Sequence, residues 1–347
     1  MKKAVAVMMA LMMTASLIVG CSGGSAKTEE SKKDGETKEV SYVYDQVGET
    51  DNPKMVEQEP EKDLKFAFIG FANNSYWDLI YEGVDAAKEN LADHNVTVDI
   101  INLGSDISAD VINNALDSCE SEGYDGIVLT CFVSGCENYI NACVKSGCQV
   151  AIIGGDAGEC DRFCYIGQDN KEAGLTVAKA IDEKLGGKKG ATFAVITSLF
   201  SMTNIEEKRN ACIDYLEDKG YVCVGSYEAH DSADETYSIT EQLLTANPDL
   251  GAIYCTAGGT YGAPKALEAN NAVDDVYVVG HDETAENLEY VRKGELDVIG
   301  QNPTGYAYDA FIYLYNKVVA DQDPEEEVMA SLSQIISKDN VNELFPE

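Results

Sequence analysis

Amide, carboxylate and aromatic side chains stand directly after strand-like runs of this sequence. Asn74, Tyr76 and Trp77 follow the first such run, and Asp282 follows a later one. Carboxylates and amides hold the hydroxyl groups of a ligand, and aromatic rings cover its apolar faces. These residue types therefore suit a site for a small polar molecule. Thr130, at the end of another run, offers a hydroxyl group to the same kind of site.

Each of these residues also has a structural interpretation. Trp77 begins an apolar stripe with the three- and four-residue spacing of a helix face, and Asn74 stands where it could cap that helix. Asp282 could likewise cap the helix that follows it. We favour the ligand-binding interpretation for all of them. His281 is left out, because neighbouring side chains on a strand point to opposite faces.

Apolar runs of strand length alternate with helical patterns from residue 64 onward. Strands are expected near 65–71, 96–101, 126–131, 149–154, 191–197, 221–227, 251–256, 275–280 and 297–300. Helices are expected near 77–91, 108–122, 137–146, 170–185, 204–219, 234–246, 261–270, 284–293 and 305–320. Such alternation predicts parallel sheets covered on both faces.

The number of these units is too large for one small open sheet. The pattern therefore favours an α/β protein of two doubly wound parallel-sheet lobes, a division that the length of 347 residues also favours. The run 163–169 has no helix beside it and is interpreted as a crossing between lobes. A closed eightfold α/β barrel is the main alternative.

The net charge is strongly negative. Lys and Arg number 25 and Asp and Glu number 61, which gives −36. Binding to nucleic acid is excluded as a function, because a phosphate backbone must be neutralised by basic side chains. We expect no nucleic-acid partner.

The N-terminus has the features of an export signal. Lys2 and Lys3 precede an apolar stretch that ends in Ile18-Val19-Gly20-Cys21. Residues 1–20 are therefore predicted to be a lipoprotein signal peptide, with Cys21 as the lipid-modified first residue of the mature chain. The alternative is an ordinary signal peptide with an incidental cysteine.

The segment 21–62 is predicted to be the lipid-anchored cysteine and a flexible tether. Residues 22–39 hold one alanine as their only apolar side chain, so they cannot bury enough surface to order themselves. Residues 40–62 are ambiguous, because Val40, Tyr42 and Tyr44 alternate as in a strand while Pro53 and Pro60 interrupt anything longer.

Ten further cysteines stand mostly in apolar or helical segments, as small core residues do. Their spacing matches neither a zinc finger nor a Cys-x-x-Cys motif. Cys160 and Cys164 flank a short loop, and the sequence leaves open whether they form a disulfide.

An ordered set of short motifs resembles the ribose-binding type of periplasmic sugar-binding proteins, the solute receptors of ABC importers. The resemblance extends over residues 64–337. It rests on Asn73-Asn74-Ser75-Tyr76-Trp77, Tyr165-Ile166-Gly167-Gln168-Asp169-Asn170, Ala173-Gly174, Lys208-Arg209, Leu243-Leu244, Asn247-Pro248-Asp249, Val278-Val279-Gly280-His281-Asp282 and Gly300-Gln301-Asn302-Pro303.

The resemblance implies two lobes joined by three crossings, with one ligand in the cleft between them. The N-terminal lobe would comprise 63–168 and 302–328, and the C-terminal lobe 169–301 and 329–347. It also implies a monomer, an ABC permease as the partner, attachment to the cell membrane through the lipid, and no cofactor.

The same resemblance assigns cleft residues. Asn74, Tyr76 and Trp77 match the turn that lines the family's cleft, Asp282 matches a strand-end carboxylate, and Gln301 matches a cleft amide at a crossing. Four other positions depart from the family. At one of them, after the strand near 251–256, Ala257-Gly258-Gly259 stands where the family has an Asn-Asp step. Asp156 stands two residues after the expected aspartate, Glu207 replaces an arginine, and Asp231 stands near an aromatic position.

These departures affect the expected ligand. Asp156, Glu207, Asp231 and Asp282 would place four carboxylates around the cleft, where desolvation requires a compensating charge. We therefore expect a ligand with an amine, or a cation beside a polyol, and exclude sugar phosphates because no Lys or Arg is placed to bind them. The alternative is that Glu207 and Asp231 lie at the solvated rim.

Two other functions remain as alternatives. The protein could present its ligand to a histidine kinase or a chemoreceptor. It could also be a metal-dependent hydrolase using His230-Asp231, His281-Asp282 and Glu207, although adjacent residues on one strand point apart. We expect neither an enzyme nor a metal site, since the sequence has no Gly-x-Ser-x-Gly, P-loop or His-Glu-x-x-His motif.

Overall fold

A computed structural model describes residues 42–44, 53–72, 74–331 and 333–346. The predicted signal peptide and Cys21 lie outside the described residues, as do residues 22–39 of the predicted tether. No helix in the described part of the chain has both the length and the apolar character needed to cross a bilayer.

Within the described residues, seven strands form the first sheet, and every neighbouring pair is parallel. Their order across the sheet is β1 (Tyr42–Tyr44), β12 (Val328–Ser331), β6 (Cys164–Gln168), β5 (Gln149–Ile153), β4 (Gly126–Leu129), β2 (Leu64–Gly70) and β3 (Val96–Asn102). The central strands β2, β4 and β5 are almost entirely apolar and buried, with Lys65 and Gln149 as the exceptions near their starts, because both faces of the sheet are covered.

Six described strands form the second sheet. Their order is β13 (Gln334–Ile336), β11 (Asp297–Gly300), β10 (Tyr277–His281), β9 (Leu250–Cys255), β7 (Thr192–Thr197) and β8 (Val222–Glu228). Only β13 among them is antiparallel to its neighbour. Both sheets are open, so the closed barrel considered from the sequence is wrong and the two-lobed α/β fold is confirmed.

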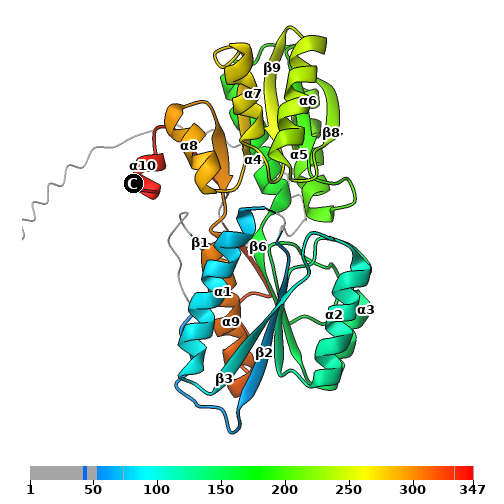
Figure 1. The fold of residues 1–347 in the computed structure, drawn as a ribbon, viewed down its shortest axis with the longest axis vertical. Helices are drawn as coiled ribbons and strands as arrows, with labels where there is room; N and C mark the ends of the chain where they lie inside the picture. Colours follow the sequence, from blue (N-terminus) through cyan, green and yellow to red (C-terminus); the bar gives the residue numbers. More distant parts are fainter. Residues whose placement is uncertain (1–41, 45–52, 73, 332, 347) are drawn as a thin grey trace, which may run out of the picture. The chain divides into compact units, whose positions relative to one another are not determined.

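Helices cover both faces of the first sheet. They are α1 (Tyr76–Ala92), α2 (Ala109–Glu122), α3 (Glu137–Ser146) and α9 (Pro303–Ala320). Helices α1 and α9 pack together on one face, and α2 and α3 pack together on the other (Figure 1). Because α9 follows β11 of the second sheet in the sequence, the first lobe is completed by chain that returns from the second lobe.

The second sheet is covered in the same way. Its helices are α4 (Asn170–Lys184), α5 (Thr203–Lys219), α6 (Ala233–Ala246), α7 (Gly262–Asn270), α8 (Ala285–Lys293) and the short α10 (Val341–Leu344). The pairs α4–α5 and α6–α7 make the most extensive helix contacts in this lobe. All helices and strands expected from the alternating pattern are present within a few residues.

Two expectations near the crossings are corrected. The run 163–169 is mostly not a crossing, because Cys164–Gln168 is strand β6, paired with β5 and β12 in the first sheet. Residues 329–331, assigned from the sequence to the C-terminal lobe, belong to β12 in the first sheet. The chain therefore crosses after β6, after β11 and between β12 and β13.

The predicted tether is also shorter than expected. Tyr42–Tyr44 adds a strand to the edge of the first sheet, beside β12. Residues of the segment 53–62 pack on α9: the N–H group of Val56 donates to Asn316 (2.8 Å), and the carbonyl of Gln58 accepts from the Tyr315 hydroxyl (2.9 Å). The segment 53–62 is ordered although it has few apolar residues, because its backbone groups make hydrogen bonds with polar side chains of α9.

The cysteines of the described residues are free thiols, including Cys160 and Cys164. Most are buried in the cores, as their apolar surroundings in the sequence suggested. The pairing that the sequence left open is absent from the structure.

Glycine allows the closest helix contacts. A Cβ atom at Gly174 of α4 would lie 2.3 Å from the carbonyl oxygen of Lys208 and 3.0 Å from the Cβ of Ala211, both on α5. Gly83 of α1 faces the Thr304 carbonyl of α9 in the same manner, at 2.1 Å. Any side chain at either position would push two helices apart.

We predict that Gly174→Ala lowers the free energy of unfolding by about 1–3 kcal/mol, the usual cost of overpacking. Alanine favours helix formation over glycine by about 1 kcal/mol, so propensity alone predicts the opposite sign. Urea unfolding measures the difference. A variant as stable as the parent would show that the α4–α5 contact adjusts freely.

Candidate functional site

A cavity of about 60 Å³ lies where the carboxyl ends of strands from both sheets approach each other. Open α/β sheets bind ligands at this edge. Six of the nine site residues expected from the sequence line it: Asn74, Tyr76, Trp77, Asp231, Asp282 and Gln301. They come from both lobes, since the first three precede or begin α1 and the others follow β8, β10 and β11.

Aromatic rings form the wall contributed by the first lobe. Trp77 is 3% exposed and makes edge-to-face contacts with Phe71 and Phe132, at centroid distances of 5.4 and 6.0 Å. Trp77 thus belongs both to the core and to the cavity wall, so its two sequence interpretations are compatible. The carboxamide oxygen of Asn74 accepts from the N–H group of Tyr76 (3.0 Å) and fixes the turn that presents these rings.

Asp282 holds the polar end of the cavity. It has a φ of +74°, a left-handed conformation that is uncommon for residues other than glycine, asparagine and aspartate. The side chain of Asn287 secures this turn by donating to the carbonyl oxygens of His281 (3.0 Å) and Asp282 (2.9 Å). The helix cap is Thr284 instead, so the capping interpretation of Asp282 is wrong.

Gln301 orients the Asp282 carboxylate. Its side-chain N–H group donates to one carboxylate oxygen at 2.8 Å, and both residues are at least 94% buried. The other carboxylate oxygen makes no hydrogen bond with a described residue. Because Gln301 stands where the chain leaves β11 for α9, this contact ties the cavity to a crossing between the lobes.

Asp231 and Gly258 bring the lobes close together. Asp231 also has a positive φ, +58°, and one of its carboxylate oxygens accepts from the N–H group of Gly258 (3.1 Å). A Cβ at Gly258 would lie 2.7 Å from the amide nitrogen of Asn74 in the first lobe. A side chain at position 258 would displace the Asn74 side chain from this position.

Lys208 is the main functional candidate that the sequence reasoning missed. It lines the cavity, is 5% exposed and makes no hydrogen bond or ion pair with any described residue. The expectation that no lysine or arginine faces the ligand is therefore wrong. A signal was present: Ile205, Lys208 and Cys212 have the three- and four-residue spacing of the buried face of α5.

Burial changes the acidity of these groups. Desolvation raises the pKa of Asp282 to about 6 although Lys208 and Gln301 oppose it, and desolvation lowers the pKa of Lys208 to about 8 although Asp282 opposes it. Desolvation and the neighbouring Asp282 also raise the pKa of Glu283 to about 7. A ligand that donates to the carboxylate and accepts from the ammonium replaces the water that both groups have lost.

Two hydrogen bonds join the lobes at the rim of the cavity. The Ser75 hydroxyl donates to Glu286 of α8 (3.1 Å), and the N–H group of Thr203 donates to the Phe132 carbonyl (3.2 Å). Both link an element of the first sheet with an element of the second. Separation of the lobes would have to break them.

The structure does not bring the other three expected residues to the cavity. The Thr130 hydroxyl is buried and donates to the Ile69 carbonyl (3.1 Å) within the first sheet. Both carboxylate oxygens of Asp156 accept from Arg162, at 2.7 and 2.6 Å. Glu207 lies on the exposed side of α5, one residue from Lys208, and with Asp156 it lines a separate pocket.

Metal binding by the histidines finds no support in the geometry. The described residues contain no group of three or more His, Cys, Asp or Glu side chains placed to hold a metal ion. His281 is fully buried and pairs with the Tyr254 hydroxyl at 2.8 Å, away from the cavity lining, as strand alternation predicted.

Residues 66–322 match the family described as periplasmic binding protein domain. Among solved structures, the chain is similar to a glucose-galactose binding protein from Geobacillus stearothermophilus, with 24% identity, a TM-score of 0.72, and 83% of this chain and 100% of that chain covered. It is also similar to an ABC transporter solute-binding protein from Burkholderia graminis in complex with D-arabinose, with 21% identity, a TM-score of 0.74, and coverages of 80% and 96%.

A third similar structure is a periplasmic ribose ABC transporter protein from Conexibacter woesei, with 22% identity, a TM-score of 0.70, and coverages of 84% and 97%. At these identities the likeness concerns the fold. No curated protein sequence matches the chain.

We predict that Glu283→Gln gains thermal stability relative to the parent as pH rises from about 4.5 to about 8. The folded protein holds the Glu283 proton more tightly than the unfolded chain does, since the pKa is raised to about 7. This contribution is fully present below the unfolded pKa and is lost as pH rises through the folded pKa, by up to about 3 kcal/mol.

Glutamine is neutral throughout this range and escapes the loss. The measurement is the difference in melting temperature between the two proteins at each pH. Because both proteins contain the same other carboxylates, the pH dependence that those groups cause is absent from this difference. A difference that does not change with pH would show that Glu283 titrates as it does in the unfolded chain.

Proposed function

The chain belongs to the periplasmic binding protein domain family, and we propose that it is an extracytoplasmic receptor for a sugar or sugar-like solute. It captures the ligand between its lobes and delivers it to an ABC importer. The observation that carries the proposal is the cavity between the two sheets, in which Trp77 faces a region holding Asp282, Gln301 and Lys208.

The chemistry of the cavity matches a neutral polyhydroxyl compound. Hydroxyl groups donate to Asp282 and Asp231 and accept from the Lys208 ammonium, so one kind of ligand group satisfies all three side chains. The rings of Tyr76 and Trp77 cover an apolar face of the ligand. A cationic ligand was expected on the basis of four cleft carboxylates, and only two of these line the cavity.

The solved structures of similar fold support the sugar class. They are a glucose-galactose binding protein, a solute-binding protein in complex with D-arabinose and a periplasmic ribose ABC transporter protein. These sugars are neutral and differ in the arrangement of their hydroxyl groups and in whether they have five or six carbons. We therefore place the ligand of this chain among monosaccharides and close relatives of them.

Capture requires the lobes to separate and close. The cavity wall comes from both lobes, and the contacts Ser75–Glu286 and Thr203–Phe132 join them at its rim. A ligand that contacts both walls stabilises the closed arrangement by its differential affinity for that state. The work of the protein is thus binding and hinge closure, without a chemical reaction.

We further propose that the protein is held at the cell membrane by a lipid on Cys21. The positive start, the apolar stretch and the ending Ile18-Val19-Gly20-Cys21 support this. Cys21→Ser should release the mature protein into the medium, because the lipid would be its only attachment. Immunoblots of membrane and medium fractions test this, and a serine variant that stays with the membranes would contradict it.

Trp77 makes ligand binding directly observable, because it is the only tryptophan of the chain and lines the cavity. Titration with neutral monosaccharides should change its fluorescence, and the sugar that does so should raise the melting temperature. Screening D-ribose, D-arabinose, D-xylose, D-glucose and D-galactose covers the class. If none changes either signal, the assignment to sugars is wrong.

For the sugar found in this way, Asp282→Asn should weaken binding about 10- to 100-fold. The variant loses a charge-assisted hydrogen bond, worth about 1.5–3 kcal/mol. The matched control is Asp218→Asn, which removes an exposed carboxylate at the far end of α5 and should leave the affinity unchanged. Calorimetric titration gives the sugar dissociation constants of both variants. If the two variants lose affinity equally, Asp282 does not contact the sugar.

A further inference from the structure

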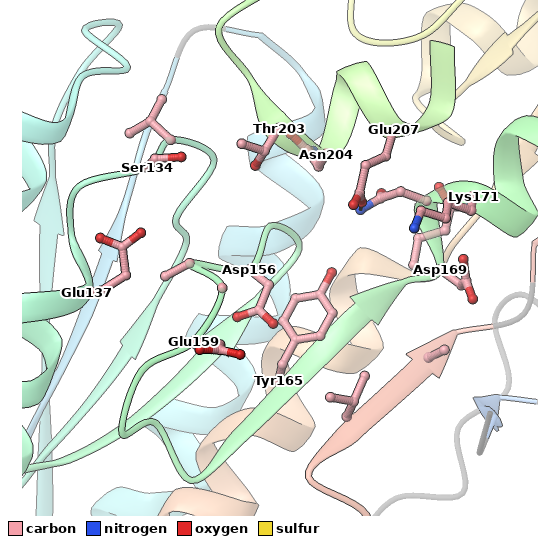
Figure 2. Close-up of a pocket in the computed structure, with 17 residues that line it drawn as sticks. Ser134, Glu137, Asp156, Glu159, Tyr165, Asp169, Lys171, Thr203, Asn204 and Glu207 are labelled. Carbon is pink, nitrogen blue, oxygen red and sulfur yellow. Dashed lines mark hydrogen bonds between the residues drawn. The ribbon is translucent and has the colours of Figure 1, made fainter. Parts of the chain in front are cut away.

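A second pocket, of about 660 Å³, adjoins the ligand cavity, and Asn204 lines both. We call it the acidic groove. Its carboxylates come from both lobes and surround an open space, with Glu137, Asp156 and Glu159 on one side and Asp169 and Glu207 on the other (Figure 2). The cavity ligand proposed above does not account for it.

The negative charge of the groove is only partly compensated. Arg162 neutralises Asp156 and also binds Glu327 (2.8 Å). Lys171 is the only cationic side chain on the lining. Five carboxylates line the groove against Lys171 and the neighbouring Arg162, so three net negative charges remain, and Glu159 forms no ion pair with any described residue.

Three amide side chains on the lining of the acidic groove have buried polar atoms without hydrogen-bond partners among the described residues. Gln168 is 2% exposed, and neither its amide oxygen nor its amide nitrogen makes a hydrogen bond with any described residue. The amide oxygen of Asn204, which is 7% exposed, is also unpartnered, as is the buried amide oxygen of Asn170. Each such atom has lost its hydration without gaining a partner, and a bound donor or acceptor would remove that cost.

We propose that the acidic groove binds an aliphatic diamine or polyamine. Each ammonium group of such a compound donates up to three hydrogen bonds, and the groove offers amide oxygens and carboxylates as acceptors at several places. The carboxylates are not gathered closely enough to hold a metal ion. The ammonium groups of a polyamine are separated by flexible methylene chains. They can therefore reach carboxylates that lie apart on the lining of the acidic groove.

The position of the groove gives the amine a consequence for sugar binding. Glu159 belongs to the first lobe and Glu207 to the second, so a compound that bridges them stabilises the closed arrangement. Its binding and that of the sugar are then linked, each tightening the other. This coupling rests on the proposed function, whereas amine binding by itself does not.

The test uses the full mature chain and spermidine as the probe, titrated by calorimetry in 150 mM NaCl. We expect one spermidine per chain, and at least tenfold weaker binding in the double variant Glu159→Gln/Glu207→Gln. The control Glu217→Gln/Asp218→Asn removes two exposed charges from the far end of α5 and should bind as the parent does. Gln168→Leu, which keeps every charge, should also weaken spermidine binding.

Three results would overturn the proposal. Equal losses in the double variant and its control, or no saturable binding by the parent, would mean only general attraction to a polyanion. Competition between spermidine and the sugar in the Trp77 fluorescence assay would place the amine in the ligand cavity instead. The sugar affinity of the groove variants is measured as well. If these variants still bind the sugar, a negative result with spermidine contradicts amine binding alone and leaves the proposed function standing.

Discussion

The buried carboxylate of Glu283 fixes the crossing on which both lobes depend. It accepts the N–H groups of Gln301 (3.3 Å) and Asn302 (2.8 Å), where the chain passes from β11 to α9. The amide of Gln301 then holds Asp282, and the side chain of Asn302 caps α9 by accepting from Gly305. One carboxylate thus aligns the polar end of the cavity with the helix that packs against α1 and its aromatic wall.

The cavity is assembled at the expense of local stability. Asp231 and Asp282 adopt left-handed backbone conformations, and Lys208 and Asp282 lose most of their hydration. Strain and buried charge of this kind persist where the surroundings enforce them. Here the surroundings are two parallel sheets with fully buried centres, which supply stability at a distance from the site.

The sequence predicted the architecture and the strand-end residues well, because both follow from local patterns. Apolar runs alternating with helical stripes specify parallel sheets, and carboxyl strand ends place Asn74 and Asp282 at one edge. Side-chain direction and partners could not be predicted. Asp156 lies near the expected position but binds Arg162, six residues later, and Glu207 differs from Lys208 by about 100° around α5. The edge pairing of β1 with β12 joins residues too far apart for any local pattern to indicate.

The contact between Gly174 and the Lys208 carbonyl has an evolutionary consequence. The backbone of residue 208 is seated against a neighbouring helix, while its side chain projects into the cavity. A substitution at 208 therefore changes the chemistry offered to the ligand without moving the helix that carries it. Specificity for a new solute could be acquired there in one step, whereas a change at the glycine opposite would cost stability.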